Sequence, residues 1–281
     1  MKNIIVSIFI NKALSVINLN ITPDIVLYRG ESMKIEEIDA IQFKNGKAYD
    51  AKENVVKDET ITLTINGEIS RSLSAIEDSL KEFAVGYLFN ENMVKSMDDI
   101  KSIEIDGVQI NAEIDDTLLK TNETVLCSDS AGGWRSKIKD VKRVESDFQV
   151  SVKELIERIE ELKDNAEIWQ ATGGTHVAGI VYDGKFVVKE DVSRHVAVDK
   201  VIGYGLLNGF DLNHSYVIYS GRMPADMVIK MTRAGVPILA SNAAPANSGY
   251  NIAKKGNITL VGFLRGQRCN IYNNQNRVIF D

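Results

Sequence analysis

The chain has 281 residues, of which 44% are hydrophobic and 26% are charged. These are ordinary globular values and argue against long-range disorder. A formal net charge of -6 argues against a general nucleic-acid coat or a polybasic membrane binder. Residues 171–281 nevertheless hold 12 Lys and Arg against 7 Asp and Glu. This local surplus suggests an anionic ligand in the second half, with chance variation in surface charge as the alternative.

The number and spacing of the cysteines bear on metal binding and on the cellular compartment of the protein. Cys127 and Cys269 are the only two cysteines, and they form no CxxC pair. This small number of cysteines excludes a Cys-rich structural zinc site, and we expect no bound metal. A reducing cytoplasm is the simplest location for a protein with so few cysteines. The apolar run in residues 1–10 is too short to span a bilayer. No small-residue cleavage site follows it closely, so we expect a short helix or strand there rather than a signal peptide.

Residues 60–65 alternate apolar and β-branched side chains and end at an Asn-Gly pair. This pattern predicts a strand followed by a hairpin turn. A capping-box spacing at residues 74–77 precedes apolar side chains at helical spacing in residues 76–88, so a helix is expected to begin there. Shorter alternating stretches continue to Leu126.

A second capping box, at residues 151–154, predicts another amphipathic helix. Beyond it, strand-like and helical patterns alternate: strands are expected at 168–171, 177–182, 216–219, 236–239 and 258–263, and helices from Arg194 and from Pro224. Such alternation predicts an α/β fold with a largely parallel sheet covered by helices. We expect two domains, residues 1–147 and 148–281, with their boundary near residues 140–150.

The segment from Ser220 to Pro224 joins a predicted strand to a predicted helix. Gly221 permits a tight turn, and Pro224 suits the first turn of a helix. The free amides of a helix start and the guanidinium of Arg222 can bind a phosphate. On this segment alone, an ordinary turn with a solvated arginine remains the alternative.

Two further segments carry groups suited to a ligand. In residues 172–176, Gly173 and Gly174 would allow close approach and His176 could donate a hydrogen bond, although a Gly-Gly turn alone is weak support. Residues 190–200 concentrate charge around a predicted helix. If that helix begins near Arg194, then His195 and Asp199 share one face; a capped surface helix with salt bridges is the alternative.

The stretch from Gly262 to Arg268 leaves a predicted strand with two arginines and a turn glycine. It suits a phosphate or a purine, with Phe263 available for stacking, and a solvated basic loop is the competing interpretation. The small polar residues 127–133 predict a flexible loop. A thiol at Cys127 could reach a second protein from such a loop, or be an unremarkable loop thiol. Cys269 lies in an apolar alternating run and is expected to pack as a small hydrophobe.

Together these segments resemble one known family. The motifs TGGTH at 172–176, EDVSRHVAVDK at 190–200, SGRMPADMV at 220–228, AGVPILAS at 234–241 and LVGFLR at 260–265 occur in the order and spacing of the FdhD family of formate dehydrogenase accessory sulfurtransferases. ING at 65–67 and the helical pattern through residues 83–88 are also similar to the family.

The resemblance implies a small α+β N-terminal domain and a three-layer, cytidine-deaminase-like C-terminal domain in a cytoplasmic homodimer. It implies that a cysteine desulfurase passes sulfur to a loop cysteine as a persulfide, and it places that acceptor at Cys127. The sulfur would then move to the molybdenum (or tungsten) bis-pterin guanine dinucleotide cofactor before insertion into the catalytic subunit of formate dehydrogenase. Nucleic acid and membrane are not among the expected partners.

The resemblance also implies a cofactor-binding segment over residues 263–268, to which GDP-like fragments should bind. The expected cofactor-binding residues are Gly173, Gly174, His176, Arg194, His195, Gly221, Arg222, Phe263, Leu264, Arg265, Gly266, Gln267 and Arg268.

The chain departs from the family pattern in its loop and its motifs. Ser130 stands where many members have a second loop cysteine, so resolution as an intramolecular disulfide is not available. Ser193 and Val196 replace the usual Gly and Asn, and Met223-Pro224 replaces small residues. A non-catalytic protein that binds and delivers the cofactor therefore remains the alternative. A zinc deaminase is excluded because His176 has no following H-x-E context and no paired cysteines follow.

Overall fold

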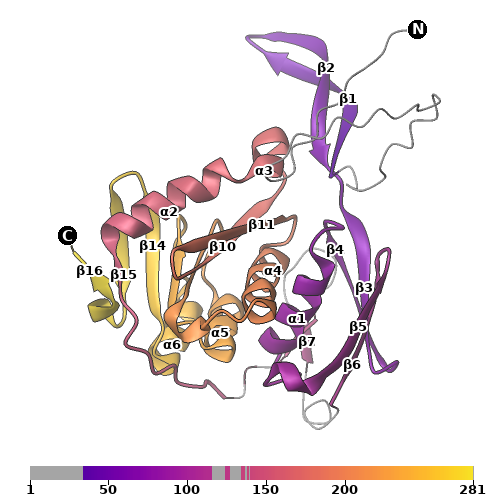
Figure 1. Ribbon diagram of the computed structural model, residues 1–281. Coiled ribbons are helices and arrows are strands. Elements are labelled where there is room, and N and C mark those ends of the chain that lie inside the picture. Colours follow the sequence, from indigo (N-terminus) through magenta and orange to yellow (C-terminus); the bar gives the residue numbers. More distant parts are fainter. Residues whose placement is uncertain (1–33, 116–123, 127–133, 137, 139, 281) are drawn as a thin grey trace, which may run out of the picture. The chain divides into compact units, whose positions relative to one another are not determined.

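The computed structural model describes residues 34–115, 124–126, 134–136, 138 and 140–280 (Figure 1). All the described residues belong to one compact unit, which spans residues 33–281. Within the described residues, no helix is both long and apolar enough to cross a membrane.

A six-stranded mixed sheet forms the centre of the second half of the chain. Its strands, in spatial order, are β11 (Lys185–Asp191), β10 (His176–Tyr182), β12 (Tyr216–Tyr219), β13 (Ile238–Ser241), β14 (Thr259–Arg265) and β15 (Arg268–Tyr272). Only the β12–β13 and β13–β14 pairs are parallel. The prediction of a largely parallel sheet is therefore wrong. The β10–β11 and β14–β15 pairs are tight antiparallel hairpins, which strand-and-helix alternation does not reveal.

Helices cover both faces of this sheet, because alternate residues of each strand point to opposite sides. One face packs against α4 (Arg194–Leu207), α5 (Ala225–Ala234) and α6 (Asn247–Gly256). The other packs against α2 (Val152–Asp164) through Leu155, Ile159 and Leu162. The predicted mixed α/β class is confirmed. The predicted cap of α2 is confirmed too, since the Ser151 hydroxyl accepts a 3.0 Å hydrogen bond from the Glu154 amide.

A second sheet, of four strands, is formed by residues that precede this region in the chain. Its spatial order is β4 (Ile69–Ala75), β3 (Glu59–Ile65), β6 (Gln109–Ile114) and β5 (Ile100–Asp106), with α1 (Leu80–Asn90) packed against it. The predicted strand and hairpin are confirmed. Asn66 and Gly67 both have positive φ, 50° and 67°, as a two-residue hairpin turn requires.

The predicted start of the first helix is wrong. Residues 69–75 are a strand, and α1 begins only at Leu80. Seven residues of β4 pair with β3, and Ser74 donates a hydrogen bond to Asp58 instead of capping a helix. Long-range strand pairing therefore outweighs a local capping signal.

The remaining elements are a hairpin of two ten-residue strands and several shorter segments. They are β1 (Ile35–Lys44), β2 (Lys47–Val56), β7 (Thr124–Leu126), β8 (Trp134–Ser136), β9 (Val150–Ser151), β16 (Val278–Ile279), α3 (Glu167–Thr172) and 3-10 turns at Met97–Asp99, Leu212–His214 and Gln275–Arg277. The strand predicted at residues 168–171 is wrong, because this stretch is α3. The Glu190 carboxylate accepts hydrogen bonds from the amides of Ile168 and Trp169. A side chain of β11 therefore stabilises the first turn of this short helix.

Helices α1 and α4 join the two sheets. They cross so closely that a Cβ on Gly86 would lie 1.9 Å from the Asp199 carbonyl oxygen, and one on Gly203 would lie 1.8 Å from that of Glu82. Only glycine permits such backbone contact. Val196 of α4 accordingly belongs to the apolar core of the four-stranded sheet. The predicted domain boundary near residue 147 stays a prediction.

Candidate functional site

The turns that the sequence singled out lie at one edge of the six-stranded sheet. Strands β12, β13 and β14 are parallel, so their carboxyl ends share an edge, and β10 begins there because it runs antiparallel to β12. We call this the carboxyl edge. It carries residues 172–176, 220–223 and 263–268. Open α/β sheets bind ligands at this position.

Gly221 brings the 220–223 turn against the start of α4. A Cβ at Gly221 would lie 2.7 Å from Tyr219 Cε2 and 3.3 Å from Arg194 Cδ, so a larger residue would displace one of these side chains. The Arg222 side chain is exposed, while its carbonyl oxygen accepts a hydrogen bond from the Tyr219 hydroxyl. Gly221, Arg222 and Arg194 are therefore neighbours, as expected for one site.

His176 connects the 172–176 segment to the same turn. Its Nδ1 lies 3.3 Å from the Ser220 hydroxyl. Gly173 ends α3 with a φ of 67°. A Cβ on Gly174 would lie 2.7 Å from Val56 Cγ1 of β2, so the close approach seen at Gly174 is to the protein's own hairpin.

The 263–268 segment projects basic side chains from the end of β14. Arg265 and Arg268 are exposed together with Gly266 and Gln267. Phe263 has a φ of 53°, and its ring lies 5.9 Å from the Arg268 guanidinium carbon, within cation–π range. Leu264 differs from its neighbours, because it is fully buried in the core that faces α2.

His195 lies beneath the edge, between α4 and α5. It is fully buried, with Nε2 3.3 Å from an Asp226 carboxylate oxygen in the first turn of α5. One turn further along α4, Asp199 pairs with Lys230 at 2.5 Å. The predicted shared face of His195 and Asp199 is therefore confirmed, and both residues are buried rather than on a surface helix.

Asp226 adds negative charge at the start of α5. Burial alone would raise the pKa of its carboxyl, but His195, Arg194 and Lys230 outweigh burial and lower the pKa to about 2. The nearby Ala225 amide already donates to Ser248. Arg222 is thus the group in this turn best placed to meet a phosphate.

Comparison with known proteins identifies the family. The model of the FdhD/NarQ family matches residues 56–279. The chain belongs to the FdhD/NarQ family. Among its relatives, "Sulfur carrier protein FdhD" of Methanothermobacter thermautotrophicus is 46% identical over 86% of this chain and 98% of its own. The protein of the same name from Shouchella clausii is 30% identical over 84% of this chain and 94% of its own.

A solved structure of this family supports the fold. The crystal structure of a candidate formate dehydrogenase accessory protein from Desulfotalea psychrophila aligns with a TM-score of 0.72 and 26% identity. It covers 87% of this chain and 99% of its own. The family resemblance inferred from the motifs is therefore confirmed.

Cys127, where the FdhD resemblance places the sulfur acceptor, lies outside the described residues, as do the other residues of 127–133. The flanking strands β7 and β8 are described, and Leu126 pairs with Trp134. The two ends of the predicted FdhD loop are therefore held together by a short antiparallel ladder. Cys269 is half-buried, and burial raises the pKa of its thiol, in keeping with the packing role expected for it.

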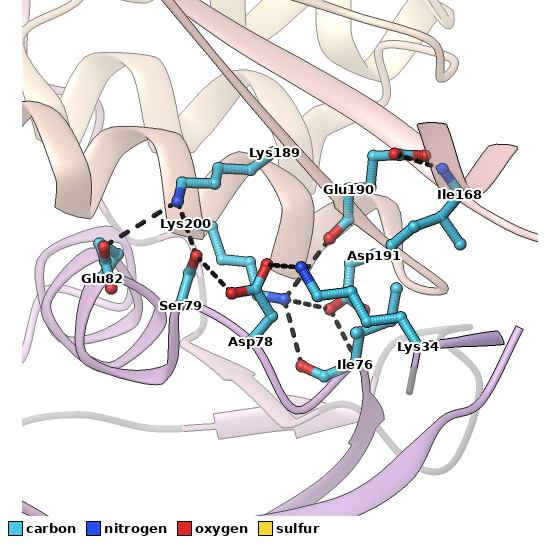
Figure 2. A network of polar contacts seen from close by, with 10 residues as sticks. All are labelled: Lys34, Ile76, Asp78, Ser79, Glu82, Ile168, Lys189, Glu190, Asp191 and Lys200. Atoms are coloured by element: carbon cyan, nitrogen blue, oxygen red, sulfur yellow. Dashed lines mark hydrogen bonds and ion pairs between the residues drawn. The ribbon is translucent and has the colours of Figure 1, made fainter. Parts of the chain in front are cut away.

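A buried ion pair fixes the start of α4, where Arg194 and His195 lie. Lys200 and Asp191 are both fully buried and lie 2.8 Å apart (Figure 2). Burial raises the pKa of Asp191, against the opposing effects of Lys200 and of hydrogen bonds from two amides. These amides are Ser193, which leads into α4, and Ile76, in the β4–α1 connection.

The charges in residues 190–200 are evident in the sequence, but their pattern does not reveal that Asp191 and Lys200 form one buried pair. The hydroxyls of Ser220 and Ser241 at the strand ends were not among the predicted site residues. Serine is common in turns, so its presence there carried no distinct signal. No cluster of three or more His, Cys, Asp or Glu that could hold a metal occurs among the residues the structure describes.

Proposed function

We propose that this chain is a cytoplasmic, homodimeric sulfur carrier that moves persulfide sulfur from a cysteine desulfurase to the molybdenum (or tungsten) bis-pterin guanine dinucleotide cofactor of formate dehydrogenase. The observation that carries the proposal is the 46% identity to a protein named as a sulfur carrier, over 98% of that protein. The similarity to a candidate formate dehydrogenase accessory protein supports the catalytic subunit of formate dehydrogenase as the final recipient.

Cys127 is the proposed sulfur acceptor. Its thiolate attacks the outer sulfur of the desulfurase persulfide, the sulfur–sulfur bond of that persulfide breaks, and the desulfurase thiolate leaves. The outer sulfur ends on Cys127 without net oxidation or reduction. Cys269 is a poorer nucleophile, because burial raises the pKa of its thiol and the reacting species is the thiolate.

The proposed cofactor site is the carboxyl edge. The exposed arginines 222, 265 and 268 can form charge-assisted hydrogen bonds with phosphates of the guanine dinucleotide. Phe263 stands beside Arg268 and can face a purine ring. Gly173, Gly174, His176, Arg194 and Gly221 would shape the same edge, and the buried His195 would act from beneath it.

Sulfur acceptance is tested by incubating the protein with a cysteine desulfurase and cysteine, followed by intact-mass measurement. The unmodified chain should gain one sulfur atom per protomer. Cys127→Ser should gain none, while the matched control Cys269→Ser should gain sulfur normally. Uptake by Cys127→Ser would overturn the assignment of the acceptor. A native chain that never accepts sulfur would favour the alternative, a cofactor-binding and delivery protein without sulfur chemistry.

Nucleotide binding is tested with GDP as a fragment of the cofactor. Arg222→Ala and Arg265→Ala should each weaken binding by about 1.5–3 kcal/mol, the range for hydrogen bonds to charged groups. Added salt should weaken binding of the native chain, because ionic contacts are screened. Arg143→Ala is the matched control, since Arg143 is exposed and pairs with Glu145 in the stretch before α2. Unchanged affinity in both edge variants would remove this site.

A further inference from the structure

Three of the strands that meet at the carboxyl edge, β10, β12 and β13, begin or end beside a hydroxyl side chain. Thr175 precedes β10, Ser220 follows β12, and Ser241 is the last residue of β13. Each hydroxyl makes hydrogen bonds that reach outside its own turn. We infer that Ser220, Ser241 and the Glu190–Thr175 pair are positioning residues, which fix the edge turns for the guanine nucleotide. This inference rests on the proposed function.

Ser241 joins two turns from a fully buried position. Its hydroxyl donates a 2.7 Å hydrogen bond to the carbonyl of Gly221 and accepts one of 3.0 Å from the amide of Ala243. The carbonyl of Ala243 in turn accepts a 2.9 Å hydrogen bond from the amide of Phe263. One side chain thus connects the turn that carries Arg222 with the segment that begins at Phe263.

Ser220 sets the neighbouring part of the edge. Its hydroxyl accepts a 3.0 Å hydrogen bond from the Val177 amide and lies 3.3 Å from His176 Nδ1. The Ser220 amide donates to the Val177 carbonyl as well. The imidazole of His176 is therefore held beside Ser220, the residue before Gly221, although His176 and Ser220 are far apart in the chain.

Glu190 holds the segment that leads into His176. Its carboxylate accepts hydrogen bonds of 2.8 Å from the amides of Ile168 and Trp169 at the start of α3 (Figure 2 draws the bond to Ile168). The same carboxylate accepts a 2.7 Å hydrogen bond from the Thr175 hydroxyl. One carboxylate therefore closes residues 168–175 at both ends, which limits how far the Gly173-Gly174 turn can move.

The consequence is an edge whose turns are ordered before a ligand arrives. Binding then does not have to order three loops, a cost that otherwise reduces affinity. Ser241 has no exposed surface, so it can affect a ligand only through the turns it holds. Removal of one such hydrogen bond should therefore weaken GDP binding by about fivefold to tenfold.

The decisive comparison is Ser241→Ala against Ser215→Ala. Both serines are fully buried, and both donate a 2.7 Å hydrogen bond to a backbone carbonyl, Gly221 for Ser241 and Asp211 for Ser215. Ser215 precedes β12 and so lies at the opposite end of the sheet. Both variants should lose similar stability towards urea. Only Ser241→Ala should weaken GDP binding, measured by calorimetry where both proteins are fully folded.

Amide hydrogen exchange of the ligand-free protein provides a second measurement. Ser241→Ala should speed exchange at Ala243 and Phe263, whereas Ser215→Ala should not. Thr175→Val should weaken GDP binding, and Thr175→Ser, which keeps the hydroxyl, should restore it. Equal GDP affinities for Ser241→Ala and the native chain, or an equal loss in Ser215→Ala, would overturn the inference.

The same samples separate this inference from the proposed function. A native chain that accepts no sulfur on Cys127 contradicts sulfur transfer but leaves the GDP comparison intact. A native chain that binds no GDP contradicts the nucleotide site of the proposed function. In that case the exchange measurement alone tests whether the Ser241 hydroxyl holds the turns. Unchanged exchange at Ala243 and Phe263 in Ser241→Ala would show that the hydroxyl does not hold these turns.

Discussion

Two regions bury polar groups in different ways. At the crossing of α1 and α4, charged groups are fully buried and paired, as in Lys200–Asp191 and Lys230–Asp199, and the backbones touch at Gly86 and Gly203. At the carboxyl edge, the fully buried Ser241 contributes a neutral hydroxyl, and the arginines 222, 265 and 268 remain exposed.

The difference follows from what each region must do. A buried ion pair requires dehydrated charges, so breaking it is costly and the partners stay together. Such pairs suit the crossing, which keeps two sheets joined. A neutral hydroxyl can hold a turn at a much smaller desolvation cost. The edge can thus be ordered while its cationic groups stay available for an anionic ligand.

The largest expected effect comes from breaking the buried pair at the crossing. Lys200→Met should lower the free energy of unfolding by about 3–5 kcal/mol, because Asp191 is left charged and buried without its partner. The loss should be greater at pH 8 than at pH 5. Burial already raises the pKa of Asp191, and removal of Lys200 should raise this pKa further. As the pH falls, the Asp191 carboxyl becomes protonated, and the neutral carboxyl destabilises the folded state less than the buried carboxylate does.

Urea unfolding at the two pH values checks this expectation, with the double variant Lys200→Met/Asp191→Asn as its control. The double variant should recover part of the stability and lose the pH dependence. A single variant as stable as the native chain would contradict the role given to the pair.

The second prediction contrasts one glycine from each region. In Gly203→Ala the new methyl group meets the Glu82 carbonyl at 1.8 Å, so the helices must separate, at a cost of about 3 kcal/mol. In Gly221→Ala it meets side-chain atoms of Tyr219 and Arg194, at 2.7 and 3.3 Å. We expect a loss of about 1 kcal/mol there, together with weaker GDP binding. Urea unfolding and calorimetry of both variants test the contrast, which fails if Gly203→Ala alone impairs binding.

The smallest effect concerns Asp226, which lies between the two regions. Its folded-state pKa of about 2 is below the ordinary 3.8, so its contribution is present above pH 4 and is lost as the pH falls towards 2. Asp226→Asn should therefore be about 2 kcal/mol less stable than the native chain at pH 5. The gap should close as the pH approaches 2.

Urea titrations between pH 5 and pH 2.5 measure this gap, and Glu157→Gln on the exposed side of α2 is the control. A constant difference between Asp226→Asn and the native chain across this range would show that His195 and its neighbours do not stabilise the ionised carboxyl.

Much of the local structure could be predicted from the sequence. The Asn66-Gly67 turn, the Ser151 cap and the helix from Arg194 depend on residues close together in the chain, and the structure confirms all three. The turns of the carboxyl edge were also foreseeable. Glycine and arginine after an apolar strand indicate a tight turn and an anion-binding group whatever the rest of the fold is.

The remaining features depend on partners that are distant in the chain. Helix α3 replaces a predicted strand because Glu190 holds its first amides, and α1 starts late because β4 pairs with β3. Whether Lys200 is a surface charge or half of a buried pair depends on Asp191 and Ile76, and the task of Ser241 depends on Gly221. Local patterns carry propensities of a few tenths to about 1 kcal/mol per residue, and tertiary hydrogen bonds and strand pairing outweigh them. The sequence therefore determined which groups stand ready for chemistry, and the tertiary structure decided which of them meet.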